Sequence, residues 1–241
     1  MAHEITLTPV QQTAAEELLA AISAGHVLVL RAAAGMGRTT VLRGVHSSTG
    51  GAFAAVRQFM DILASRQPAA IEEAFLQMIE EALASHDLVI VDDLHLVTSV
   101  VESCNYARSY MLDAALTAIM GEAGARNKKL VFGVEGDAPW PVRRRAHSSE
   151  IGEFTPADYE CICRAYLEAD VADRLDYARI HRFAPALNAH QLKNACVWLA
   201  RGAELESDRF IDYLSSQNMA SNVNTKRFPR SAGRISRAAT S

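Results

Sequence analysis

The sequence predicts an α/β fold, in which a parallel sheet is flanked by helices and followed by a small all-helical domain. Short, continuously apolar runs alternate with segments whose apolar residues recur at helical spacing, which is typical of strands buried in a parallel sheet. Beyond Thr155 and Pro156 no further strand is predicted, and residues 156–218 have the pattern of three or four helices. The predicted strands are 27–30, 52–56, 88–91, 130–134 and 151–154.

The predicted helices of the sheet region cover residues 9–22, 39–46, 70–84 and 107–121. The first begins at Thr8 and Pro9, where a capping hydroxyl precedes a proline at the first helical position. We expect three regions in the chain. They are an α/β domain (1–154), a helical domain (155–218) and a basic, disordered tail (219–241).

Composition limits the classes of function. The chain has 241 residues and a formal charge of −4, although residues 222–241 carry five basic residues and no acid. The body is therefore more acidic than the total, which argues against extended nucleic-acid binding. No apolar run is long enough to cross a bilayer, and the N-terminus has no secretory pattern, so we expect a cytoplasmic protein without a membrane partner. The four cysteines show no metal-site spacing and are expected to be reduced.

A glycine-containing loop links the first predicted strand to the second helix. The phosphate-binding loop of nucleotide-binding proteins has the pattern G-x-x-x-x-G-K-[ST] between a strand and a helix. In residues 32–39 Gly37 and Thr39 match this pattern, whereas Ala32 replaces the first glycine and Arg38 replaces the lysine. The alternative is a strand-to-helix turn without a ligand. The predicted phosphate-binding residues are Ala34, Gly35, Met36, Gly37, Arg38, Thr39 and Thr40.

The substitution of Arg38 for lysine affects how this loop would hold a nucleotide. Backbone N–H groups of such a loop wrap the phosphates, and the helix N-terminus adds a favourable field. Arginine keeps the positive charge, but its planar fork differs from the compact ammonium of lysine. We therefore expect weakened or altered nucleotide handling.

Two acids end the third strand, at Asp92 and Asp93. A carboxylate in this place, together with the loop hydroxyl, is suited to bind Mg²⁺, so Thr39 and Asp92 are the predicted metal ligands. Asp93 stands where a catalytic glutamate usually polarises water, although its side chain is one methylene shorter. The alternative is that both acids cap the strand and face solvent.

Three consecutive arginines, Arg143, Arg144 and Arg145, follow the fourth strand. A run of charges is often a solvated surface. The functional alternative is a set of arginine fingers that stabilise the γ-phosphate held by a neighbouring subunit.

These features, in this order, resemble the AAA+ ATPases over most of residues 5–218. The series continues with residues 151–158, similar to the family's apolar segment before the helical lid, and with residues 189–192 in place of its lid signature. The resemblance implies a P-loop sheet domain and a lid with ATP and Mg²⁺ between them. It also implies homo- or hetero-oligomers with other AAA+ subunits that remodel a protein substrate.

Several positions depart from the family pattern. Arg38, Ala32 and Asp93 replace the usual residues, and Glu135, Gly136 and Asp137 follow the fourth strand, where the family has a polar sensor. We expect a degenerate ATP-binding module with weak hydrolysis, which assembles with like subunits. The alternative is an inactive AAA+-fold scaffold without turnover of its own. A nucleic-acid-associated P-loop protein is a third, less favoured hypothesis.

Overall fold

A five-stranded, all-parallel sheet forms the centre of the molecule. The computed structural model describes residues 6–65, 71–103, 109–200 and 205–219. The strand order is β2-β3-β4-β1-β5, and each neighbouring pair is parallel. The predicted fold class, a parallel sheet flanked by helices and followed by helices, is confirmed. The strands are β1 (Val27–Arg31), β2 (Ala52–Ala54), β3 (Leu88–Val91), β4 (Lys129–Val134) and β5 (His147–Glu150).

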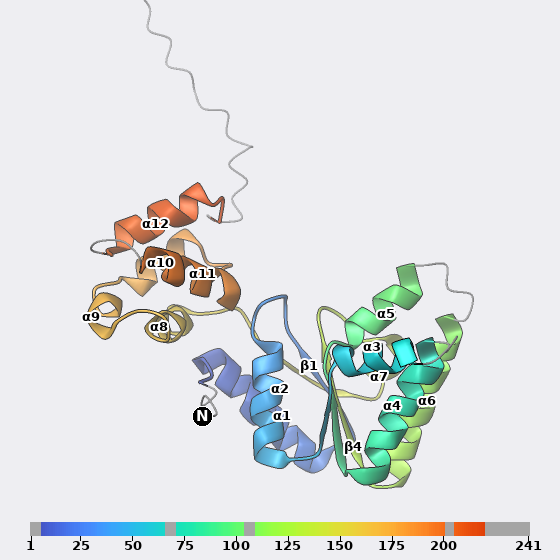
Figure 1. The fold of residues 1–241 in the computed structure, drawn as a ribbon. Coiled ribbons are helices and arrows are strands. Elements are labelled where there is room, and N and C mark those ends of the chain that lie inside the picture. The colour runs from blue at the N-terminus through green and yellow to red at the C-terminus, as the bar shows by residue number, and fades with distance from the viewer. Residues whose placement is uncertain (1–5, 66–70, 104–108, 201–204, 220–241) are drawn as a thin grey trace, which may run out of the picture.

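Helices cover both faces of the sheet (Figure 1). One face carries α1 (Pro9–Ala24) and α2 (Arg38–Thr49). The other carries α3 (Val56–Ser65), α4 (Ile71–Ser85), α5 (Leu94–Ser103), α6 (Ser109–Ala125) and α7 (Trp140–Arg143).

Alternation along the strands divides the apolar side chains between two cores. In β1, Leu28 and Leu30 pack into the core that contains α1 and α2, whereas Val27 and Val29 pack into the opposite core. Successive strand side chains point to opposite faces, so a strand covered on both faces must be apolar throughout. This is the physical origin of the continuous apolar run in the sequence.

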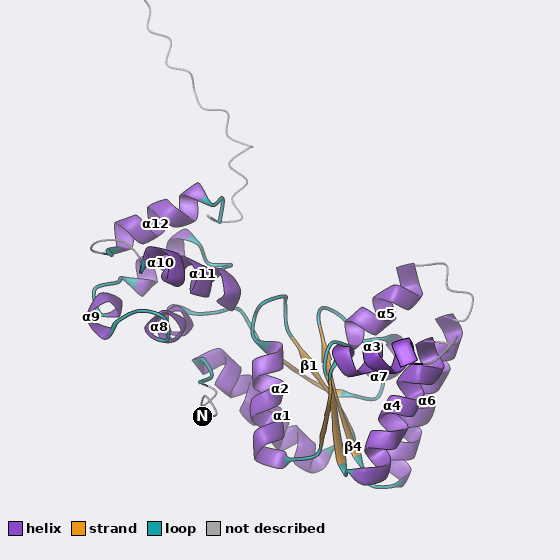
Figure 2. Ribbon diagram, viewed as in Figure 1, coloured by secondary structure: helices purple, strands orange, loops and turns teal. Residues whose placement is uncertain are grey.

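The C-terminal helices form a separate group beside the sheet, on the side of α1 and α2 (Figure 2). Their apolar residues belong to the same continuous core as α1, α2 and one face of the sheet. The predicted division at residue 155 stays a prediction, and the expected tail lies, except for Met219, outside the described residues. The helices are α8 (Pro156–Arg164), α9 (Ala169–Ala172), α10 (Tyr177–Phe183), α11 (Ala189–Leu199) and α12 (Ser207–Ser216).

The fifth predicted strand is wrong in position. The strand is His147–Glu150, and residues 151–154 follow it as an irregular segment in which Ile151 and Phe154 are buried. As the edge strand, β5 pairs only with β1, and only Ser149 of its residues is buried, so a polar sequence is sufficient. The helices α3, α5 and α7 were not predicted.

Within the described residues, no helix combines the length and apolarity needed to cross a bilayer. Among the described residues, Cys161, Cys163 and Cys196 form no disulfide, and Cys104 lies outside them. The Sγ atoms of the buried residues Cys163 and Cys196 are 3.3 Å apart, where α8 packs against α11.

Asp158 joins the C-terminal helices to the start of α1. Its buried carboxylate accepts hydrogen bonds from the Thr155 backbone N (2.7 Å), the Thr155 hydroxyl (2.6 Å) and the Val10 backbone N (2.9 Å). Burial alone would raise the pKa of Asp158, but these hydrogen bonds outweigh it and lower the pKa below the ordinary 3.8.

The substitution Asp158→Asn should lower the free energy of unfolding by about 2 kcal/mol at pH 7, because an amide replaces a charged acceptor. Because the pKa is lowered in the folded state, the ionised carboxylate contributes to the free energy of unfolding. This contribution is present above the ordinary pKa of 3.8 and is lost as the pH falls through the lower, folded-state pKa. Urea unfolding of both proteins from pH 7 to pH 3 measures this. If the difference in free energy of unfolding between the two proteins stayed constant down to pH 3, the ionised carboxylate of Asp158 would not be the stabilising group.

Candidate functional site

The strand order brings three chain segments to one edge of the sheet. Strand β4 lies between β1 and β3, and all three are parallel, so their carboxyl ends are adjacent. The glycine loop follows β1, Asp92 and Asp93 follow β3, and Glu135 follows β4. Crevices at the carboxyl ends of such strands are the usual ligand sites of open α/β sheets.

The loop presents the N-terminus of α2 without a side-chain cap. Gly37 is the N-cap residue, with φ of +89°, and within the described residues this helix has no side-chain cap hydrogen bond. The residue before Gly37 is held by α1. Gln11 of that helix donates a hydrogen bond from Nε2 to the Met36 carbonyl (2.8 Å) and so holds the loop against α1. Uncapped N–H groups at a helix N-terminus, together with the helix dipole, favour an anion.

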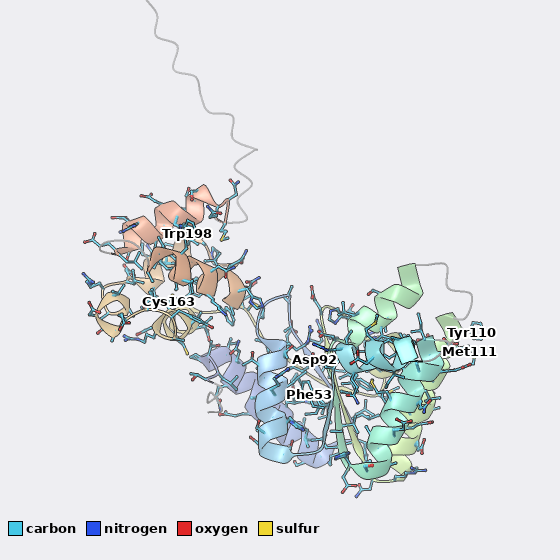
Figure 3. All side chains as sticks on the ribbon, viewed as in Figure 1. Phe53, Asp92, Tyr110, Met111, Cys163 and Trp198 are labelled. Carbon is cyan, nitrogen blue, oxygen red and sulfur yellow. The ribbon has the colours of Figure 1, made fainter. Side chains whose placement is uncertain are left out.

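Four of the predicted site residues contact one another at the sheet edge. Arg38 Nε donates to Asp92 Oδ1 (3.0 Å), and Arg38 Nη2 donates to Asp93 Oδ1. The hydroxyl of Thr39 donates to Asp92 Oδ2 (2.6 Å). Figure 3 labels Asp92 at this end of the sheet, on the side facing the C-terminal helices.

Both oxygens of Asp92 are therefore occupied by protein donors. Asp92 Oδ1 also accepts from the backbone N of Asp93 (2.9 Å), where Asp93 adopts a positive φ of 59°. The predicted metal ligands Thr39 and Asp92 thus bind each other. Among the described residues, no group of three or more His, Cys, Asp or Glu has the arrangement of a metal site. Arranged in this way, these residues do not fit a directly coordinated cation.

Glu135 adds an uncompensated negative charge beside the loop. Its carboxylate lies 3.7 Å from His95 Nε2 and is 45% exposed. Burial lowers the pKa of His95, and the charge of Arg38 lowers it further, against the opposing effect of Asp93, Glu135 and Asp92. The pKa of His95 therefore lies below its ordinary 6.5, so the imidazole adds little positive charge beside Glu135 at pH 7.

A cavity of about 560 Å³ lies between the loop and the C-terminal helices. Its volume is that of a site for a small organic ligand. Of the predicted phosphate-binding residues, Met36 does not line it, because its side chain is buried in the core. The residues that line it include Ala34, Gly35, Gly37, Arg38, Thr39, Thr40 and Glu135.

Helix α11 closes the far side of this cavity. His190 and Lys193 line it, and Lys193 Nζ lies 5.3 Å from the centroid of the Tyr166 ring. Asn188, the N-cap residue of α11, donates from Nδ2 to the Ala34 carbonyl (3.3 Å), and Ala189 N donates to the Gly35 carbonyl (3.0 Å). The C-terminal helices therefore contact the loop directly.

Sequence reasoning missed Gln11 and Lys193. Gln11 completes a capping box with Thr8, a pattern visible in the sequence as a threonine followed three residues later by glutamine. Lys193 lies one helical turn after Ala189, so its place on the same face could have been found from the helical period. The direction of that face depends on how the helices pack.

The three arginines lie away from the cavity. Arg143 Nη1 donates to Asp137 (3.4 Å), and Arg145 Nη1 donates to the Thr117 carbonyl (3.0 Å). Arg143 and Arg144 both stack on Trp140, which is 59% exposed. Within the described part of the chain, none of them lines the cavity beside the loop. Their predicted action on a neighbouring subunit stays a prediction.

We expect Gly37→Ala to lower the free energy of unfolding by about 3 kcal/mol, compared with about 1 kcal/mol for Gly50→Ala. Both glycines have positive φ, so both variants are strained. A Cβ at Gly37 would also lie 2.2 Å from Gln11 Nε2, whereas Gly50 has free space around it. Urea denaturation of the two variants measures the difference. Equal losses would show that Gln11 does not hold the loop.

Comparisons with known proteins bear on the fold. No family model matches the sequence, and no curated protein matches it. Among solved structures, the chain is similar to domain III of the replication initiation protein DnaA from Thermotoga maritima, with a TM-score of 0.58. The sequences are 13% identical over 87% of this chain and 93% of that domain. This likeness shows that the chain shares the fold of that domain, a parallel sheet flanked by helices with a helical C-terminal region.

Proposed function

We propose that this chain is an ATP-binding module of the AAA+ type, which binds its nucleotide between the loop after β1 and helix α11. The observation that carries the proposal is the cavity beside the uncapped N-terminus of α2. Its free N–H groups are suited to phosphates, and Lys193 adds a positive charge on the opposite wall. The AAA+ fold supports the same site.

We further propose that the module retains nucleotide rather than turning it over rapidly. Hydrolysis needs a carboxylate that orients the attacking water, a role expected for Asp93. Asp93 accepts a hydrogen bond from Arg38, and its side chain is shorter than that of glutamate. We therefore expect weak hydrolysis or none. The pairing of Arg38 with Asp92 and Asp93 also supports the alternative of an inactive scaffold without turnover of its own.

Assembly with like subunits is part of the proposal. The exposed cluster of Trp140, Arg143 and Arg144 would meet the nucleotide of a neighbouring subunit. Exposed tryptophan and arginine are enriched where protein interfaces form. A protein partner is proposed as the substrate of remodelling, and nucleic acid is not, because the body of the chain is acidic.

Calorimetric titration with ATP tests the nucleotide site. We expect wild type to bind and Arg38→Ala to lose at least about tenfold in affinity, because the buried carboxylate of Asp92 and the partly exposed carboxylate of Asp93 would lose their cation. Arg43→Ala is the matched control, since Arg43 lies on the same helix, is exposed, and stacks on Phe53 outside the cavity. If wild type binds neither ATP nor ADP at millimolar concentration, the proposed function is disproved.

Glu135→Gln should raise the affinity for ATP by about fivefold and the affinity for ADP by less, because the γ-phosphate carries the extra charge that Glu135 repels. Competition between the two nucleotides, measured for the variant and for wild type, gives the ratio of the affinity for ATP to the affinity for ADP. Glu153→Gln, an exposed acid that does not line the cavity, is the control. An unchanged ratio would show that Glu135 lies away from the terminal phosphate.

A further inference from the structure

The guanidinium of Arg38 lies where a divalent cation would be expected. Its Nε and Nη2 atoms donate to Asp92 and Asp93, the two acids that end β3. The side chain of Arg38 is 10% exposed and that of Asp92 is 3% exposed. A charged pair shielded from water in this way is held firmly, because separating it would leave a buried carboxylate without a partner.

The other hydrogen-bond donors around Asp92 leave no carboxylate oxygen for a metal ion in addition to the Arg38 guanidinium. The Thr39 hydroxyl donates a hydrogen bond to Asp92 Oδ2, and the Asp93 backbone N–H and Arg38 Nε both donate to Asp92 Oδ1. Mg²⁺ requires oxygen ligands in nearly octahedral geometry and gives up its water reluctantly. A metal at this position would have to displace Arg38 from both acids, and it would also meet the positive charge of the guanidinium.

We propose that Arg38 replaces the divalent cation of this site, so that the pocket binds its nucleotide as a metal-free anion. The inference rests on the proposed function, since it concerns the ligand of the same cavity. The loop amides and Lys193 contact the phosphates, while Arg38 offsets part of the negative charge of the two acids that would otherwise repel them.

The charges around the cavity select among metal-free nucleotides. Arg38 offsets one of the two acids at the end of β3, and Glu135 remains uncompensated at the end of β4. Without a metal to screen it, the additional charge of a triphosphate is disfavoured beside Glu135. A nucleoside diphosphate is therefore the preferred ligand of the free chain.

Calorimetric titration with ADP, in EDTA and then in magnesium, tests the inference in wild type, Arg38→Lys and Arg43→Lys. For wild type and Arg43→Lys the affinity should change by less than about twofold on adding magnesium. For Arg38→Lys it should rise by about tenfold or more, since one ammonium cannot bridge both acids as the fork does and a carboxylate becomes available to the metal.

Binding of Mn²⁺, followed by electron paramagnetic resonance without nucleotide, gives a second readout of the same competition. Arg38→Lys should retain more Mn²⁺ than wild type, and Arg43→Lys should not. Wild-type ADP binding that requires magnesium would overturn the inference and leave the proposed function intact. Absence of ADP and ATP binding in every condition would overturn the proposed function, and the Mn²⁺ comparison would then decide the role of Arg38 alone. Equal Mn²⁺ binding by all three proteins would refute that role.

Discussion

A buried ion pair between Arg38 and Asp92 connects the parts of the candidate site. It joins the first residue of α2 to the end of β3, although β4 lies between β3 and the strand that precedes α2. Gly133 of β4 makes this contact possible, because a Cβ there would lie 2.6 Å from Asp92 Oδ1 and 3.3 Å from Arg38 Cδ. The pair thus requires a glycine in the middle strand, and the loop, the acids and β4 form one unit.

The C-terminal helices are part of the same unit. Asn188 and Ala189 bond to the carbonyls of the loop, and Asp158 bonds to the first turn of α1. Through Gln11, α1 in turn holds the Met36 carbonyl. The loop is therefore held between α1 and α11, so a change in the packing of the C-terminal helices would alter the geometry offered to a phosphate. A ligand bound at the loop would therefore be coupled to the position of these helices through direct contacts.

The departures from the AAA+ pattern form a coherent set when their contacts are considered. Arginine in place of lysine reaches two acids at once, and the shorter Asp93 is one of the two that it contacts. The neighbour of Glu135 is His95, whose lowered pKa leaves little positive charge beside this carboxylate at pH 7. Together these contacts direct the positive charge of Arg38 to the acids and away from the loop. This arrangement is the basis for proposing a site that holds a nucleotide more readily than it transfers the terminal phosphate.

The sequence by itself determined the class of the fold and the loop and acids at the centre of the candidate site. Continuous apolar runs identify buried parallel strands, because both faces of such strands must be covered, and the glycines with Thr39 mark the strand-to-helix loop. The sequence could not place β5, since an edge strand needs few apolar residues, and it missed Gln11 and Lys193. Only the tertiary structure decided that Arg38 contacts Asp92 and Asp93. Those residues are more than 50 positions apart, and their meeting depends on the insertion of β4 between β1 and β3.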